Sequence, residues 1–142
     1  MLNTAFVLAQ SSVAKAPTET LVVVSGSARH TFEVEVAETE AQKARGLMFR
    51  TSVPKGTGML FPHDGERELT MWMRNTYVSL DMLFIRADGT IHRIAANTEP
   101  MSEDIIASEG AVSAVLELGA GEAKRLGIKP GDRVNFRTFK SQ

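Results

Sequence analysis

The sequence predicts a mainly β (β-rich α+β) domain, either a β-sandwich or a half-open barrel of about eight short strands with one or two short capping helices. Two observations lead to this prediction. Short apolar or alternating segments recur between turn residues, and helical patterns are few and short. The sequence argues against a doubly wound α/β fold, because its crossover helices would have no residues to occupy.

Four strands are predicted in the first half of the chain. Residues 21–24 are rich in valine, and residues 32–36 alternate between apolar side chains and glutamate, which places one face in the core and the other in water. A loop at residues 25–29 separates these two strands. Residues 59–61 form a short apolar strand, and residues 69–73 form a further alternating strand.

Four further strands are predicted in the second half, at residues 80–85, 91–95, 112–118 and 134–139. Asp88 and Gly89 lie between the first two of them. This dipeptide is typical of a two-residue type I′ hairpin turn, which needs a positive φ at both positions.

Two short helices are predicted as caps. Thr39 and Gln42 fit a capping box, in which the threonine begins the helix and the glutamine reaches back to its backbone N–H. Gly46 would end this helix in the left-handed conformation. A second short helix is predicted at residues 121–126, and Gly127 would end it.

Residues 1–19 differ from the single domain expected at residues 20–142. Residues 1–10 are apolar and uncharged but too short to span a bilayer, and residues 11–20 are mostly small or polar. One interpretation is a signal-peptide remnant followed by a tether, which implies a periplasmic or secreted protein. The alternative is a disordered or peripheral N-terminus of a cytoplasmic protein.

The composition excludes several classes of function. Lys plus Arg is 16 and Asp plus Glu is 17, and the resulting net charge of −1 argues against nucleic-acid binding. The chain has no cysteine, which excludes disulfides, cysteine nucleophiles, iron–sulfur clusters and thiolate zinc sites. Walker A, dinucleotide and nucleophile-elbow motifs do not occur in the sequence, and no cofactor is predicted.

An ordered series of motifs runs from Phe32 to Val134. The motifs are ARGLMFR at 44–50, GMLF at 58–61, WMRNT at 72–76, LDMLFI at 80–85, DG at 88–89, VLEL at 115–118, AG at 120–121 and LGIKPGDRV at 126–134. In this order the chain resembles the DUF192 family, also called UPF0127. The resemblance implies a compact β-rich domain, bacterial or archaeal origin and frequently an export signal, but no established activity and no catalytic residues. Ser79 stands where we expect a proline, so the loop before Asp81 should be less rigid than in relatives.

Trp72 is the only tryptophan, and a regular strand would place it on the opposite face from Met73. If exposed, it would suit stacking on a sugar or another flat ligand, with Arg74, Asn75 and Thr76 fixing the ligand's orientation. Alternatively, Trp72 fills a second core layer and the polar residues after it make a turn.

Arg45 and Arg50 flank Gly46 and Met48. Arginine binds carboxylate or phosphate through two parallel hydrogen bonds, and glycine permits close approach of a ligand to the backbone, so an anionic group could bind here. Alternatively, Arg45 is a cation at a helix C-terminus and Arg50 makes an internal salt bridge.

Asp81 and Glu117 are acids within strongly apolar segments. If the fold brings them together, they could form the general acid/base pair of a hydrolase. Alternatively, each pairs with an arginine and stabilises the fold. His63 and Asp64 could supply two metal ligands for such a hydrolase, although a catalytic zinc usually has three; the alternative is a solvated acidic loop.

We therefore predict a small non-catalytic accessory domain that binds a small molecule, a saccharide or a peptide. The alternatives are the hydrolase and a domain whose edge strand pairs with a partner's strand. No catalytic residue, metal or cofactor is assigned. The predicted ligand-binding residues are Arg45, Gly46, Met48, Arg50, Trp72, Met73, Asn75, Thr76, Asp81 and Glu117.

Overall fold

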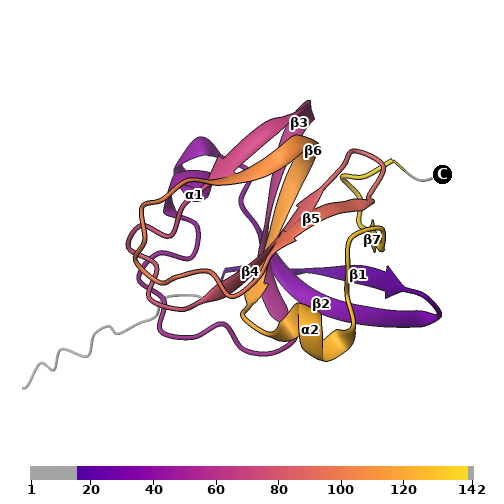
Figure 1. Cartoon of the computed structure of the whole chain (residues 1–142), viewed down its shortest axis with the longest axis horizontal. Coiled ribbons are helices and arrows are strands. Elements are labelled where there is room, and N and C mark those ends of the chain that lie inside the picture. Colours follow the sequence, from indigo (N-terminus) through magenta and orange to yellow (C-terminus); the bar gives the residue numbers. More distant parts are fainter. Residues whose placement is uncertain (1–15, 141–142) are drawn as a thin grey trace, which may run out of the picture.

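The structure is a computed structural model and describes residues 16–140, so the apolar segment at residues 1–10 lies outside the described residues. Seven strands form one mixed sheet in the order β5-β4-β6-β3-β2-β1-β7, which coils into a half-open barrel (Figure 1). The strands are β1 (Glu19–Ser25), β2 (Ala28–Val36), β3 (Thr57–Met71), β4 (Leu80–Ile85), β5 (Ile91–Ala95), β6 (Ile106–Gly119) and β7 (Arg133–Asn135). The mainly β prediction is confirmed, with seven strands in the described residues instead of about eight.

The long strands β3 and β6 pair along the centre of the sheet and carry much of its curvature. They have 15 and 14 residues, and their antiparallel register shifts between Pro62 and Arg67 and again between Glu68 and Thr70. Such irregularities bend a strand and increase its twist. The two strands that we predicted separately in this region are therefore one continuous strand, and that prediction was wrong.

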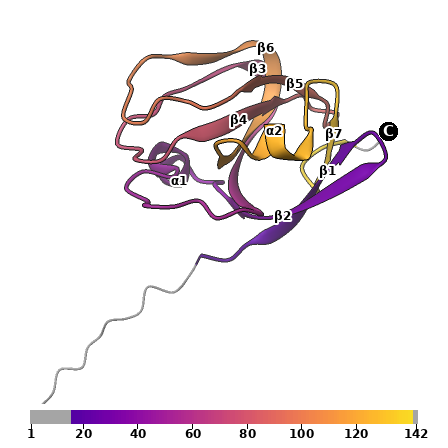
Figure 2. The same ribbon diagram turned by 60° about the horizontal axis from the view of Figure 1, so that its bottom comes forward.

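The sheet carries apolar clusters on both faces. One cluster contains Leu116 and Leu118 of β6 with residues of β1, β2, β4 and β7, and α2 (Glu122–Leu126) packs against it. The other contains Val115 of β6 and Met82 of β4, and the segment after α1 (Glu40–Arg45) covers it. Figure 2 shows the two helices well apart, α1 beside the loops and α2 beside β4. Because side chains alternate along a strand, Glu117 shares the face of the second cluster.

Local sequence signals determine where the helices begin and end. The Gln42 N–H donates to Thr39 Oγ1 at 3.1 Å, and the Thr39 N–H donates to the Gln42 side chain at 3.0 Å, which confirms the predicted capping box. The second predicted helix is α2, and it ends at Gly127, which has a φ of 72°.

Two details of the strands differ from the predictions. The connection between β4 and β5 is not the predicted type I′ turn, which needs a positive φ at both Asp88 and Gly89. Gly89 has a φ of 91°, but Asp88 does not have a positive φ. The turn is instead closed by the Gly89 N–H, which donates to the Arg86 carbonyl. β7 is shorter than predicted because a turn follows it, closed by the Phe139 N–H on the Phe136 carbonyl. Within residues 16–140, none of the helices has the length and apolar character needed to cross a membrane.

Candidate functional site

A pocket of about 200 Å³ lies between the end of α1 and the connection from β3 to β4. Its lining comes from three parts of the chain. These are α1 and the turn after it (Lys43, Ala44, Arg45, Gly46, Leu47, Met48), β3 and its connection (Phe61, Thr70, Met71, Trp72, Arg74, Thr76), and β6 (Glu117). The structure thus brings together six of the predicted residues: Arg45, Gly46, Met48, Trp72, Thr76 and Glu117.

The turn after α1 forms one wall of the pocket. Gly46 ends the helix with a φ of 48° and a ψ of −133°, and its N–H donates to the Gln42 carbonyl at 2.8 Å, so the left-handed conformation expected here was wrong. A positive φ favours glycine, and a Cβ at this position would lie 3.2 Å from Cζ of Phe61, so a larger residue would displace this ring or the turn. Lys43 and Arg45 lie in the last helical turn, where a positive charge is favourable.

Backbone hydrogen bonds join three loops near the pocket. The Phe49 N–H donates to the Asn75 carbonyl at 2.9 Å, and the Met101 N–H donates to the Thr76 carbonyl at 3.0 Å. Phe49, Asn75 and Met101 have φ values of 67°, 54° and 68°, a conformation that is costly for residues other than glycine. Such backbone strain persists only where the surrounding structure imposes it, and it is often found at ligand sites.

Aromatic rings and guanidinium groups lie together at the rim. Trp72 is 41% exposed, so the interpretation of Trp72 as a core residue was wrong. The Arg74 guanidinium lies 5.2 Å from the Trp72 ring centroid, and the Arg45 guanidinium lies 5.5 Å from that of Phe49. The Phe49 ring in turn makes an edge contact with Tyr77 at 6.1 Å. The rim therefore offers both flat apolar surface and positive charge.

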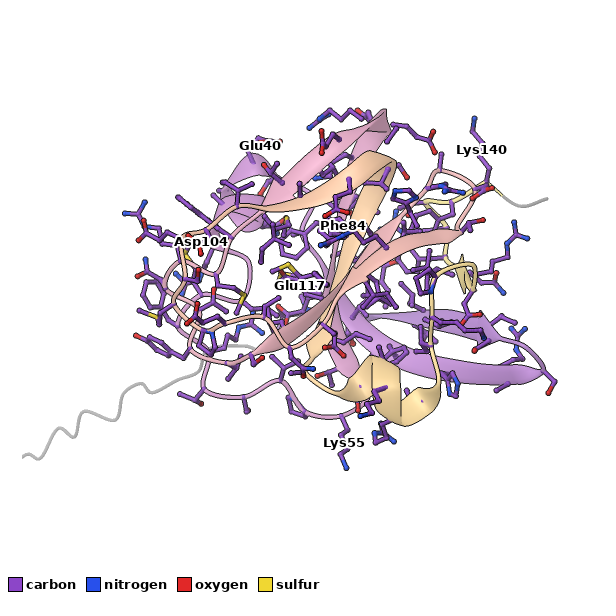
Figure 3. The ribbon with its side chains drawn as sticks, viewed as in Figure 1. Glu40, Lys55, Phe84, Asp104, Glu117 and Lys140 are labelled. Atoms are coloured by element: carbon purple, nitrogen blue, oxygen red, sulfur yellow. The ribbon has the colours of Figure 1, made fainter. Side chains whose placement is uncertain are left out.

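Glu117 is the buried acid of the pocket. Its side chain is 4% exposed, lies in the middle of the molecule (Figure 3), and is flanked across the sheet by the buried residues Met59 and Met82. Within residues 16–140 its carboxyl group has neither a hydrogen bond nor an ion pair. Burial raises the pKa of Glu117 to about 8, because the charged form would lose its solvation. The group is therefore mostly uncharged at neutral pH.

Asp81, a predicted site residue, lies away from this pocket. It is 1% exposed, and its carboxylate accepts hydrogen bonds from three backbone N–H groups, those of Asn97 (3.0 Å), Gly121 (3.1 Å) and Ala123 (3.0 Å). The bonds from Gly121 and Ala123 fix the beginning of α2 on the face opposite to Glu117, and the bond from Asn97 holds the segment after β5. The fold therefore does not bring Asp81 and Glu117 together, which the alternative of an acid/base pair required.

Three more predicted site residues lie outside the pocket lining. Arg50 donates to both carboxylate oxygens of Glu35, at 2.6 and 2.9 Å, which is the internal salt bridge that the sequence left as an alternative. Met73 is fully buried, and its sulfur accepts a hydrogen bond from Thr98. Asn75 contributes its carbonyl to the loop contacts described above.

The metal alternative at His63 and Asp64 finds no third ligand. No group of three or more metal-ligating side chains occurs in the described part of the chain. His63 Nδ1 lies 3.2 Å from a guanidinium nitrogen of Arg67. Burial, followed by the charges of Lys43 and Arg67, lowers the pKa of His63. Asp64 is exposed, but it lies within β3, so the loop expected at this position was wrong.

Sequence reasoning missed several lining residues, including Lys43, Phe61 and Thr70. One signal was available for Lys43: it lies with Arg45 in the last turn of the predicted helix, directly before the turn at Gly46. Phe61 and Thr70 lie nine positions apart on β3, and no local pattern shows that they share a pocket, because the strand bends between them.

Comparisons with known proteins agree with this architecture. A family model named DUF192 and described as "Uncharacterized ACR, COG1430" matches residues 21–136. A crystal structure from Sinorhizobium meliloti 1021, provisionally described as a transcription regulator, is 44% identical, with a TM-score of 0.83 over 87% of this chain and 97% of that chain. A second crystal structure, from Novosphingobium aromaticivorans DSM 12444 and described as a protein of unknown function, is 41% identical, with a TM-score of 0.83 over 93% of this chain and 94% of that chain. A search of curated proteins gives no match.

Proposed function

Since this chain belongs to the DUF192 family, which is described as uncharacterised, we propose its function from the pocket itself: a small non-catalytic domain that binds a small molecule between Trp72 and Glu117. Trp72 would supply flat apolar contact at the rim. Glu117 would supply the polar contact in the interior of the pocket.

The observation that carries the proposal is the unpartnered carboxyl group of Glu117. Among the described residues, the side-chain polar atoms that are fully enclosed without a partner are His30 Nε2 and Arg93 Nη1, so the Glu117 oxygens instead reach the open space of the pocket. Here the group lines a pocket, where a ligand can supply the missing partner. A protonated carboxyl offers one donor and one acceptor, which suits a ligand group that both donates and accepts.

Binding is favoured over hydrolysis by the arrangement of the acids. Carboxylate hydrolases place two carboxyl groups on one reacting bond, with environments that separate their pKa values. Asp81, the other acid of this region, is occupied by three backbone N–H groups on the opposite face of the sheet. Glu117 is thus the one fully buried acid among the described residues that line this pocket.

The single tryptophan makes the proposal directly testable. Trp72 lines the pocket, so its fluorescence reports on this site alone. Titration of the full chain with a library of small metabolites should give saturable fluorescence changes for a group of related compounds. Glu117→Leu, which removes both the donor and the acceptor, should weaken or abolish the response, whereas Glu68→Leu, at an exposed position of β3, should leave it unchanged. A library without any hit would contradict the proposal.

The proposal places the protein in a bacterium and outside the cytoplasm. It is supported by the apolar residues 1–10 with the polar segment after them, and by the bacterial origin of both similar structures. The proposed function does not include regulation of transcription, because a protein with a net charge of −1 has little electrostatic attraction to DNA. Fractionation of cells that express the full chain should find the mature protein in the periplasm or medium; cytoplasmic retention would contradict export.

A further inference from the structure

Three cationic side chains line the pocket, and two of them form only long ion pairs with exposed glutamates. Lys43 Nζ lies 3.9 Å from a carboxylate oxygen of Glu40, whose side chain is 95% exposed, and Arg74 Nε lies 3.9 Å from the exposed Glu103. Ion pairs of this length in water contribute little. Arg45 has no ion pair within residues 16–140. The rim of the pocket is therefore positively charged.

Three other arginines of the protein are fully engaged by carboxylates, whereas Arg45 and Arg74 are not. Arg50, Arg125 and Arg137 each hold a carboxylate through two nitrogen atoms, at distances of 2.6–2.9 Å. Arg45 and Arg74 make no such two-nitrogen contact within residues 16–140; their guanidinium groups lie 5.5 and 5.2 Å from the centroids of aromatic rings, as those of Arg93 and Arg137 also do. A guanidinium beside an aromatic ring can still bind the two oxygens of an anion through its N–H groups.

Glu117 does not offset this charge. Desolvation is the cause of its raised pKa, so the carboxyl group remains mostly neutral at pH 7. A neutral carboxyl can donate its O–H to a ligand oxygen and accept a hydrogen bond from a hydroxyl. The pocket therefore combines positive charge at the rim with a neutral hydrogen-bonding group inside, and a cationic ligand would be repelled.

We infer that the pocket binds a small organic oxyanion that also carries a hydroxyl or carboxamide group. Its carboxylate or phosphate lies against Arg45 and Arg74, its body lies on Trp72, and its neutral polar group bonds Glu117. This inference rests on the proposed function. The pocket volume of about 200 Å³ is below the ~300–1,000 Å³ of drug-sized sites, which limits the ligand to one ring or a short chain.

The test compares compounds of one skeleton that differ in charge. The sugar series is glucuronate, glucose 6-phosphate, glucose and glucosamine, and the aromatic series is 4-hydroxybenzoate, 4-hydroxybenzamide and 4-hydroxybenzylamine. Each is titrated into the full chain, with Trp72 fluorescence and the Trp72 indole N–H signal in ¹⁵N NMR spectra as readouts. In at least one series the anion should bind about tenfold or more tightly than the neutral and cationic members, because it gains charge-assisted hydrogen bonds. Glucuronate and glucose 6-phosphate distinguish carboxylate from phosphate.

Variants assign the effect to the rim. Arg45→Gln and Arg74→Gln should each weaken binding of the anion about tenfold, and the NMR spectrum of each variant shows whether its fold is retained. The matched control is Arg29→Gln, at an exposed position in the β1–β2 hairpin, which extends away from α1 (Figure 1). Equal or tighter binding of a neutral or cationic member would overturn this inference but leave the proposed function standing. If no compound of either series perturbs Trp72, this inference fails, and the broader library decides the proposed function.

Discussion

Asp81 and Glu117 lie on neighbouring strands of the sheet but face opposite sides of it. Asp81 of β4 pairs with Leu118 of β6, whereas Glu117 pairs with Met82. Because successive side chains of a strand alternate, this register directs one carboxyl group to the beginning of α2 and the other to the pocket. The first acid is fully hydrogen-bonded to the backbone, and the second has no partner in the described chain. We therefore assign Asp81 to folding and Glu117 to recognition.

Asp81→Ala should destabilise the protein by about 2–4 kcal/mol, because it leaves one buried and two partly buried backbone N–H groups without their acceptor. Urea unfolding followed by circular dichroism measures this loss. Asp64→Ala, at an exposed position, is the control and should change the free energy of unfolding by less than about 0.5 kcal/mol. Equal effects of the two substitutions would show that Asp81 does not hold α2.

Glu117 should make the protein less stable as the pH rises from about 4.5 to about 8. The carboxyl group ionises near 4.5 in the unfolded chain and near 8 in the folded protein, so between these values the folded state holds a proton that the unfolded state has lost. Stability therefore falls across this window and is constant above it. Glu117→Gln removes the fall and should gain a few kcal/mol relative to wild type between pH 5 and pH 8.

Urea unfolding of both proteins at pH 5, 6, 7 and 8 measures this difference. Glu68→Gln serves as the matched control, since Glu68 is exposed and its substitution should leave the pH dependence of wild type intact. If wild type and Glu117→Gln have parallel stability profiles over this range, Glu117 is ionised in the folded protein and its assigned state is wrong.

Trp72→Ala should leave the protein folded while abolishing binding in the pocket. Trp72 is 41% exposed, so its truncation should cost about 1–2 kcal/mol, whereas Phe84→Ala in the fully buried core should cost about 3–5 kcal/mol. Thermal unfolding compares the two variants, and isothermal calorimetry measures binding of whichever compound the screen identifies. A Trp72→Ala protein that is unfolded, or that still binds with the wild-type affinity, would contradict the role of this side chain.

Local signals were sufficient to predict the helices. The capping box of Thr39 and Gln42 and the terminal Gly127 act through residues within a few positions, and the structure confirms both. The β3 strand was harder to predict, because Pro62 and the polar residues up to Glu68 look like a loop. These residues remain in the strand because β6 is long enough to pair on both sides of the irregular region.

The site could be predicted only in part, because contacts between distant parts of the chain decide which side chains reach the pocket. Arg45 and Arg50 look equivalent in the sequence, yet Glu35 of β2 pairs with Arg50 and leaves Arg45 at the pocket. Alternation in residues 115–118 does show that Glu117 and Leu116 face opposite sides. Which side holds the pocket depends on the register with β4 and on the position of α1, and neither is encoded by nearby residues.

The central claim is that an uncharged carboxyl group lies inside this pocket, and its titration tests that claim most directly. The protein is labelled with ¹³C at the glutamate side-chain carboxyl carbons, and Glu117→Gln identifies the Glu117 signal by its disappearance. We predict that this signal titrates with a midpoint near pH 8, well separated from the exposed glutamates. A midpoint near 4.5, together with those of the surface glutamates, would show that Glu117 is charged at neutral pH and would contradict the account.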